Sequence, residues 1–96
     1  MTSVTGAITQ ELVYQVAYEA NKRAAIVLPQ DSLTAFGEAF QRETKPLAHF
    51  ILGQLLENSK LAIAESRPMC GDTGLPRYYV KVGNNAVIEG GFVAME

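Results

Sequence analysis

The chain has a single cysteine, a single histidine and no cluster of basic residues, and each shortage excludes a class of function. One cysteine cannot form an internal disulfide framework, and one cysteine with one histidine gives no support for a zinc site. Lys and Arg total 8 in 96 residues and the formal net charge is −2, which gives no electrostatic reason to expect nucleic acid or an anionic membrane as a partner. We therefore expect neither a nucleic-acid partner nor a membrane partner.

Long apolar runs and phosphate-binding glycine motifs are also missing. No stretch approaches the roughly 18 apolar residues of a spanning helix, and no basic-then-apolar signal segment opens the chain. Neither G-x-x-x-x-G-K nor G-x-G-x-x-G occurs, which excludes the common nucleotide-binding loops. Together with the lone cysteine, these features favour a reducing, cytoplasmic location.

What is present suits one small globular domain, since 48% of the residues are hydrophobic and 19% are charged. Apolar residues at helical spacing predict an N-terminal segment of three helices over about residues 5–66. The first helix runs over about residues 5–25 and ends before Pro29, the second ends near Arg42, and Arg67-Pro68 stops the third. The expected N-caps are Asp31 or Ser32 for the second helix and Thr44 for the third.

Each predicted helix has one apolar face, which we expect to point inward. The inner-face residues are Ile8, Leu12, Val13, Val16, Ala17, Ala20 and Ala24 in the first helix, Leu33, Phe36 and Phe40 in the second, and Leu47, Phe50, Ile51, Leu55 and Ala62 in the third. His49 has no ligand partner one turn away, so a solvated or hydrogen-bonded histidine is the better interpretation.

After Gly74 the period changes from helical to alternating. Tyr78, Val80 and Val82 alternate with polar or aromatic residues as in a half-buried strand, and Gly83-Asn84-Asn85 predicts a turn. We therefore expect a loop over residues 67–77 and a short β-hairpin within about residues 78–94, which gives an α+β fold. Two strands are marginal alone, so we expect the hairpin to need further elements for its stability.

The loop holds the residues best suited to chemistry, in the order Arg67-Pro68-Met69-Cys70-Gly71-Asp72-Thr73-Gly74. A thiolate is a soft metal ligand, a carboxylate is an acid or base, and glycines let backbone approach a bound group. Plainer interpretations remain open. Cys70 could pack as a small hydrophobe, and Asp72 and Thr73 could bond turn backbone.

Asp72-Thr73-Gly74 is also the active-site triplet of aspartic proteases. Such a protease would be built almost wholly of strands, with an apolar strand leading directly into the aspartate. Here the first two thirds of the chain are helical in period, and Cys70-Gly71 precede the aspartate. The context therefore argues against a protease.

The loop resembles the first cysteine segment of the iron–sulfur hydro-lyases, a family that includes the α chain of L-tartrate dehydratase and class I fumarate hydratase. Its members carry Pro-x-Cys-Gln-Asp-Thr-Gly followed by a strand. The matching residues here are Pro68, Cys70, Asp72, Thr73 and Gly74, and the segment Tyr79–Gly83 is similar to the strand and turn that follow. Gly71 stands where the family usually has Gln.

This resemblance implies a [4Fe-4S] cluster with three protein cysteines, of which Cys70 is the one this chain provides, and an open iron that binds substrate. It implies catalytic roles for Asp72 and Thr73, and substrate-binding positions at Gly71, Arg77 and Lys81. The expected substrate is a small hydroxy-dicarboxylate, to which water is added or from which it is removed.

The same resemblance implies that residues 1–96 are the N-terminal segment of an α domain, with a β subunit or β domain and a homo-oligomer as partners. Alone, such a segment should be inactive, because one thiolate does not hold a cluster. The alternatives are a non-catalytic helical lobe that packs on a partner and a truncated fragment without activity.

Overall fold

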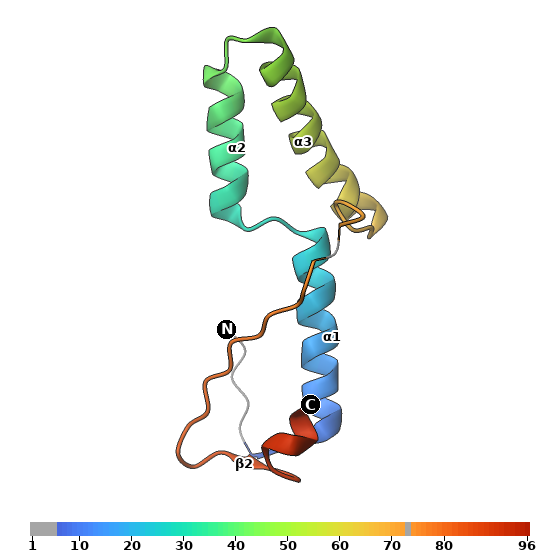
Figure 1. The fold of residues 1–96 in the computed structure, drawn as a ribbon, viewed down its shortest axis with the longest axis vertical. Coiled ribbons are helices and arrows are strands. Elements are labelled where there is room, and N and C mark those ends of the chain that lie inside the picture. The colour runs from blue at the N-terminus through green and yellow to red at the C-terminus, as the bar shows by residue number, and fades with distance from the viewer. Residues whose placement is uncertain (1–5, 73) are drawn as a thin grey trace. The chain divides into compact units, whose positions relative to one another are not determined.

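The structure, a computed structural model, describes residues 6–72 and 74–96. In chain order its elements are β1 (Ala7–Ile8), α1 (Gln10–Ile26), α2 (Gln30–Arg42), α3 (Pro46–Glu65), β2 (Val87–Ile88) and the 3-10 helix η1 (Phe92–Met95) (Figure 1). Helices predominate and one two-stranded sheet accompanies them, so the predicted α+β class is confirmed at that level. Within the described residues, no helix is both long enough and apolar enough to cross a membrane.

The residues form two compact units, and the boundary between them falls within α1. The first unit joins the N-terminal segment up to Asn21 with Gly74–Glu96, and it contains β1, β2 and η1. The second unit begins at Lys22 and contains α2, α3 and the loop that carries Cys70.

In the second unit, α2 and α3 lie side by side (Figure 1). The predicted inner face of α2 is confirmed, because Leu33, Phe36 and Phe40 are all half-buried. The ring of Phe40 stacks on the imidazole of His49 with centroids 4.0 Å apart and planes 19° apart. The same ring also lies close to the backbone of Gly53. A glycine allows this, since a Cβ at position 53 would lie 3.1 Å from Cε2 of Phe40.

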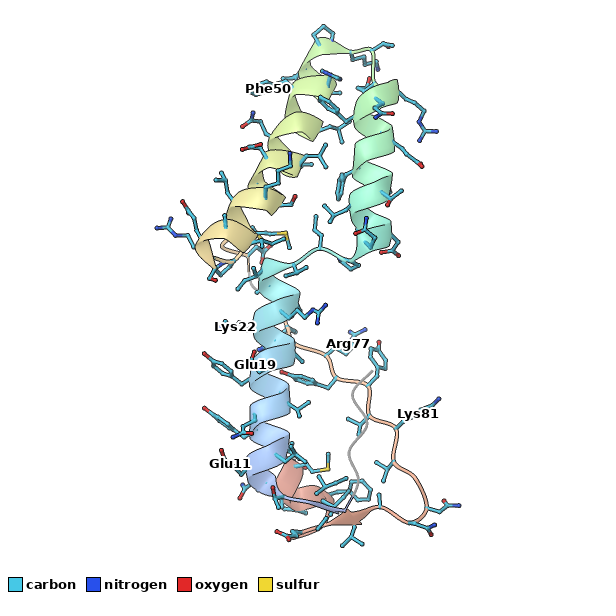
Figure 2. The ribbon with its side chains drawn as sticks, turned by 180° about the vertical axis from the view of Figure 1, so that it is seen from behind. Glu11, Glu19, Lys22, Phe50, Arg77 and Lys81 are labelled. Carbon is cyan, nitrogen blue, oxygen red and sulfur yellow. The ribbon has the colours of Figure 1, made fainter. Side chains whose placement is uncertain are left out.

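The inner face predicted for α3 is wrong for four of its five residues. Leu47, Phe50, Ile51 and Leu55 are exposed, with 72, 62, 48 and 43% of their surface accessible. The half-buried side contains His49 and Gly53 instead, and Figure 2 shows Phe50 on the side of α3 that faces away from α2. Apolar side chains lie on both the exposed and the half-buried side of α3, so their spacing does not select one face.

The helix starts differ from the predicted caps. Pro29 and Lys45 flank the first residues of α2 and α3, and neither provides a side-chain cap. Asp31 lies inside α2, where its Oδ1 accepts a hydrogen bond from the Ser32 amide at 2.8 Å. The side-chain caps expected at Asp31, Ser32 and Thr44 are therefore absent from the described residues.

The predicted start of the first helix at Thr5 lies outside the described residues, and α1 begins at Gln10. Thr9 caps it, because its Oγ1 accepts a hydrogen bond from the Leu12 amide at 3.1 Å. The predicted inner face of α1 is only partly covered. Leu12, Val13 and Ala17 are half-buried, whereas Val16, Ala20 and Ala24 are exposed.

The predicted β-hairpin is not formed. Residues 78–82 are all described and form no strand, and β2 pairs instead with β1, in parallel. Ala7 lies opposite Val87, Ile8 lies opposite Ile88, and the Glu89 amide donates to the Ile8 carbonyl at 2.9 Å. The partner of the C-terminal strand thus comes from the other end of the sequence.

Few side chains are buried. Among the described residues, Ala62 and Ser59 on the last turns of α3 are the buried ones, at 3 and 4% accessibility. The hydroxyl of Ser59 donates to the Leu56 carbonyl at 2.7 Å, which satisfies its polar oxygen. Among the described residues, the best-packed part is therefore the end of α3, directly before the cysteine loop.

Candidate functional site

The cysteine loop begins with a specific termination of α3. Ser66 adopts a left-handed conformation (φ 51°, ψ 48°), and the Arg67 amide donates to the Ala62 carbonyl at 3.0 Å. The Ser66 amide lies 3.3 Å from the Ile63 carbonyl, so both bonds of a Schellman motif are present. Pro68 follows and cannot continue a helix, as the sequence predicts.

Two hydrogen bonds then fix Met69. Its amide donates to the carbonyl of Ala25 near the end of α1 at 3.0 Å, and its carbonyl accepts from Nδ2 of Asn58 on α3 at 2.7 Å. Ala25, Asn58 and Met69 all belong to the second unit. The residue before the cysteine is therefore held from two helices.

Cys70 is exposed and its thiol is free. Sγ lies 3.5 Å from the backbone carbonyl of Asp72, which is a weak contact for a thiol donor. Within the described residues no side chains cover the Cys70 thiol, whereas a cysteine packed as a small core hydrophobe would be covered. The loop presents the thiol outward.

Asp72 is exposed, and among the described residues its carboxylate accepts no hydrogen bond. Gly71 is also exposed, has no positive φ, and a Cβ there would meet nothing within 4 Å. Gly74 has φ +60°, a conformation that favours glycine. Turn geometry thus explains Gly74 but does not require a glycine at position 71. The predicted catalytic residue Thr73 lies outside the described residues.

The predicted substrate-binding residues Arg77 and Lys81 are both exposed and belong to the first unit, whereas Cys70, Gly71 and Asp72 belong to the second. Figure 2 shows Lys81 projecting away from the segment that carries it. Arg67 pairs with Glu65 at 3.5 Å, but both side chains are more than half exposed and such pairs contribute little.

The described residues offer no complete metal site, because no three His, Cys, Asp or Glu side chains are grouped together. His49 is hydrogen-bonded, which is one of the two states that the sequence analysis expects for it. Its Nδ1 lies 3.0 Å from the Phe40 carbonyl, and since a carbonyl only accepts, Nδ1 is the protonated nitrogen in this contact. Cys70, the one cysteine of the sequence, is exposed, and its thiol makes a single weak contact with described residues.

The sequence analysis did not identify Asn58, whose side chain donates a hydrogen bond to this loop. Its contact joins residues 11 positions apart, one on a helix and one in a loop. Helical periodicity describes the face of a helix and carries no information on which loop folds back against it.

A family profile and two individual proteins match this chain, and all of them are hydratases or dehydratases by name. The sequence profile of the family described as fumarate hydratase (Fumerase) matches residues 14–95, which include the cysteine loop. A protein of Methanocaldococcus jannaschii assigned as L(+)-tartrate dehydratase subunit alpha is 36% identical over 73 residues, covering 76% of this chain and 26% of that protein.

A protein of Geobacillus stearothermophilus assigned as fumarate hydratase class I is also 36% identical over 73 residues, covering 75% of this chain and 14% of that protein. The chain thus spans about a quarter and about a seventh of the lengths of these relatives. No solved structure matches the chain.

Proposed function

Because the chain belongs to the fumarate hydratase (Fumerase) family, we propose that it provides one cluster ligand and one acidic group to an iron–sulfur-dependent hydro-lyase. The observation that carries this proposal is the exposed Cys70 thiol in an anchored loop, two residues before an exposed Asp72 carboxylate. The substrate class is a small hydroxy-dicarboxylate, in keeping with the hydratase and dehydratase names of the relatives.

The donor chemistry of the chain fits one corner of a [4Fe-4S] cluster. Cysteine thiolates are the usual ligands of such clusters, and the thiol of Cys70 is exposed and makes only one weak contact. The other ligands must come from residues outside this sequence, because it contains one cysteine. The chemistry that the group supplies when bound is Lewis-acid stabilisation of departing hydroxide.

Asp72 is our candidate for a group that orients the substrate or exchanges a proton near its hydroxyl. Its carboxylate is exposed, and no described residue engages it. We propose that Thr73 assists it as a second polar group of the motif. Arg77 and Lys81 are exposed cations that could contact the substrate carboxylates, and Gly71 leaves open space beside the motif.

We further propose that residues 1–96 are the N-terminal segment of a larger α domain that works with a β subunit or β domain in a homo-oligomer. The large apolar residues exposed on α3 support this, since exposed apolar patches commonly mark a surface that another element covers. Leu47 and Phe50 would be covered in that domain. A reducing cytoplasm suits the free thiol.

The test is Cys70→Ser in the complete protein, purified anaerobically. The variant should lose the visible absorption of the cluster and its hydratase activity, because the serine hydroxyl is a poor iron ligand. Helical circular dichroism should stay close to wild type, since Cys70 is exposed and contributes no packing. A variant that keeps its iron and turnover would remove Cys70 from the site and favour a non-catalytic, partner-binding lobe.

A further inference from the structure

Met69, the residue before the proposed ligand, is the point at which two helices meet the loop. The Ala25 carbonyl accepts its amide hydrogen at 3.0 Å, and the Asn58 side chain donates to its carbonyl at 2.7 Å. The first bond uses backbone alone and is available to any residue other than proline at position 69. The second depends on the amide side chain of Asn58.

The two bonds act on different peptide planes. The Met69 amide belongs to the plane shared with Pro68, and the Met69 carbonyl belongs to the plane shared with Cys70. Each plane is rigid, so a fixed carbonyl also fixes the Cys70 nitrogen and Cα in that plane. The Asn58 bond therefore determines where the Cys70 side chain starts.

We infer that Asn58 is a positioning residue that holds Cys70 in place for the cluster. This inference rests on the proposed function, and it adds a residue that touches neither cluster nor substrate. Asn58 is exposed and on the last turns of α3, so it stabilises the loop without being part of the packed end of that helix. Groups around a metal ligand that fix its orientation commonly affect metal retention.

The test compares Asn58→Asp with two other variants of the complete protein. Asn58→Asp keeps the size of the side chain but replaces the donor by a carboxylate, which repels the Met69 carbonyl. Gln54→Glu is the matched control, because it makes the same amide-to-acid change one turn earlier on the exposed side of α3. Asn58→Gln keeps an amide donor and tests rescue.

Two readouts are measured. In cluster-free protein, amide exchange of the segment around Met69 should be about 5- to 10-fold faster in Asn58→Asp, the scale of one lost hydrogen bond. In anaerobically loaded protein, the rate of iron release should rise by about the same factor, with helical circular dichroism unchanged. Gln54→Glu should match wild type in amide exchange and in iron release. Asn58→Gln should keep most of the iron that wild type keeps.

Several results would overturn the inference. Wild-type exchange and iron retention in Asn58→Asp would show that the bond does not position the loop. If Gln54→Glu speeds amide exchange and iron release as much as Asn58→Asp does, the added charge alone causes both effects. If Asn58→Gln loses iron as fast as Asn58→Asp does, the effects come from altered packing and not from the lost donor. A wild-type protein that binds no cluster would overturn the proposed function together with this inference, and iron counting on wild type identifies that case separately.

Discussion

Gly37 and Gly53 form a matched pair for measuring how tightly α2 and α3 pack. Both are interior glycines of helices, where alanine is favoured by about 1 kcal/mol because it restricts the unfolded backbone. A Cβ at Gly37 would meet nothing within 4 Å, whereas one at Gly53 would lie 3.1 Å from Cε2 of Phe40. The two alanine variants therefore gain the same helix propensity, and they differ in whether the new methyl group contacts Phe40.

The Phe40 ring is poorly able to move away from a new methyl group. It stacks on His49 at 4.0 Å, and the Phe40 carbonyl binds Nδ1 of the same histidine. Adding a methyl group to such a contact typically costs about 1–3 kcal/mol. We therefore expect Gly37→Ala to stabilise α2 by about 0.5–1 kcal/mol, and Gly53→Ala to be destabilising by about 0–2 kcal/mol.

Amide exchange measured on peptides from α2 and α3 of the complete protein reports these local stabilities directly. Exchange of α2 should slow in Gly37→Ala, and exchange of α3 should become faster in Gly53→Ala. Adding Phe40→Leu to Gly53→Ala should recover part of the loss, because the smaller side chain makes room for the methyl group. If Gly53→Ala slows exchange as much as Gly37→Ala, the close packing of Phe40 against Gly53 is refuted.

Two predictions concern the proposed chemistry. Asp72→Asn in the complete enzyme should lower kcat by roughly 10² or more at unchanged iron content, because an amide cannot transfer the proton; near-normal turnover would leave Asp72 as a loop-shaping residue. The isolated 96-residue chain, reconstituted anaerobically, should hold no stoichiometric cluster, because it carries one thiolate. Iron and sulfide counting checks this, and one cluster per monomer would contradict it.

The sequence predicted the elements that depend on local signals. Helical spacing located α2 and the Phe40 face, and Arg67-Pro68 located the end of α3. The loop around Cys70 was found because its glycines and prolines exclude regular structure. These features need no knowledge of distant residues.

The errors arose where a distant partner decides the structure. The alternation of residues 78–82 favours a strand, but Tyr79 and Val80 are 87 and 63% exposed and β2 pairs with β1 from the other end of the chain. In α3 the choice of inner face depends on where α2 lies, since both sides are apolar. Asn58 was missed for a similar reason, because its partner is a backbone carbonyl in a loop.

The pairing of β1 with β2 also sets an order of events during synthesis. Ala7 can pair with Val87 only after Val87 has been synthesised, 80 positions later (87 − 7). At about 5–20 residues per second, translation of that stretch takes roughly 4–16 s, whereas helix pairs form in well under a second. The contact of α2 with α3 and the Asn58 bond to Met69 need only residues made earlier. We therefore expect the cysteine loop to be anchored on the nascent chain before the sheet can close.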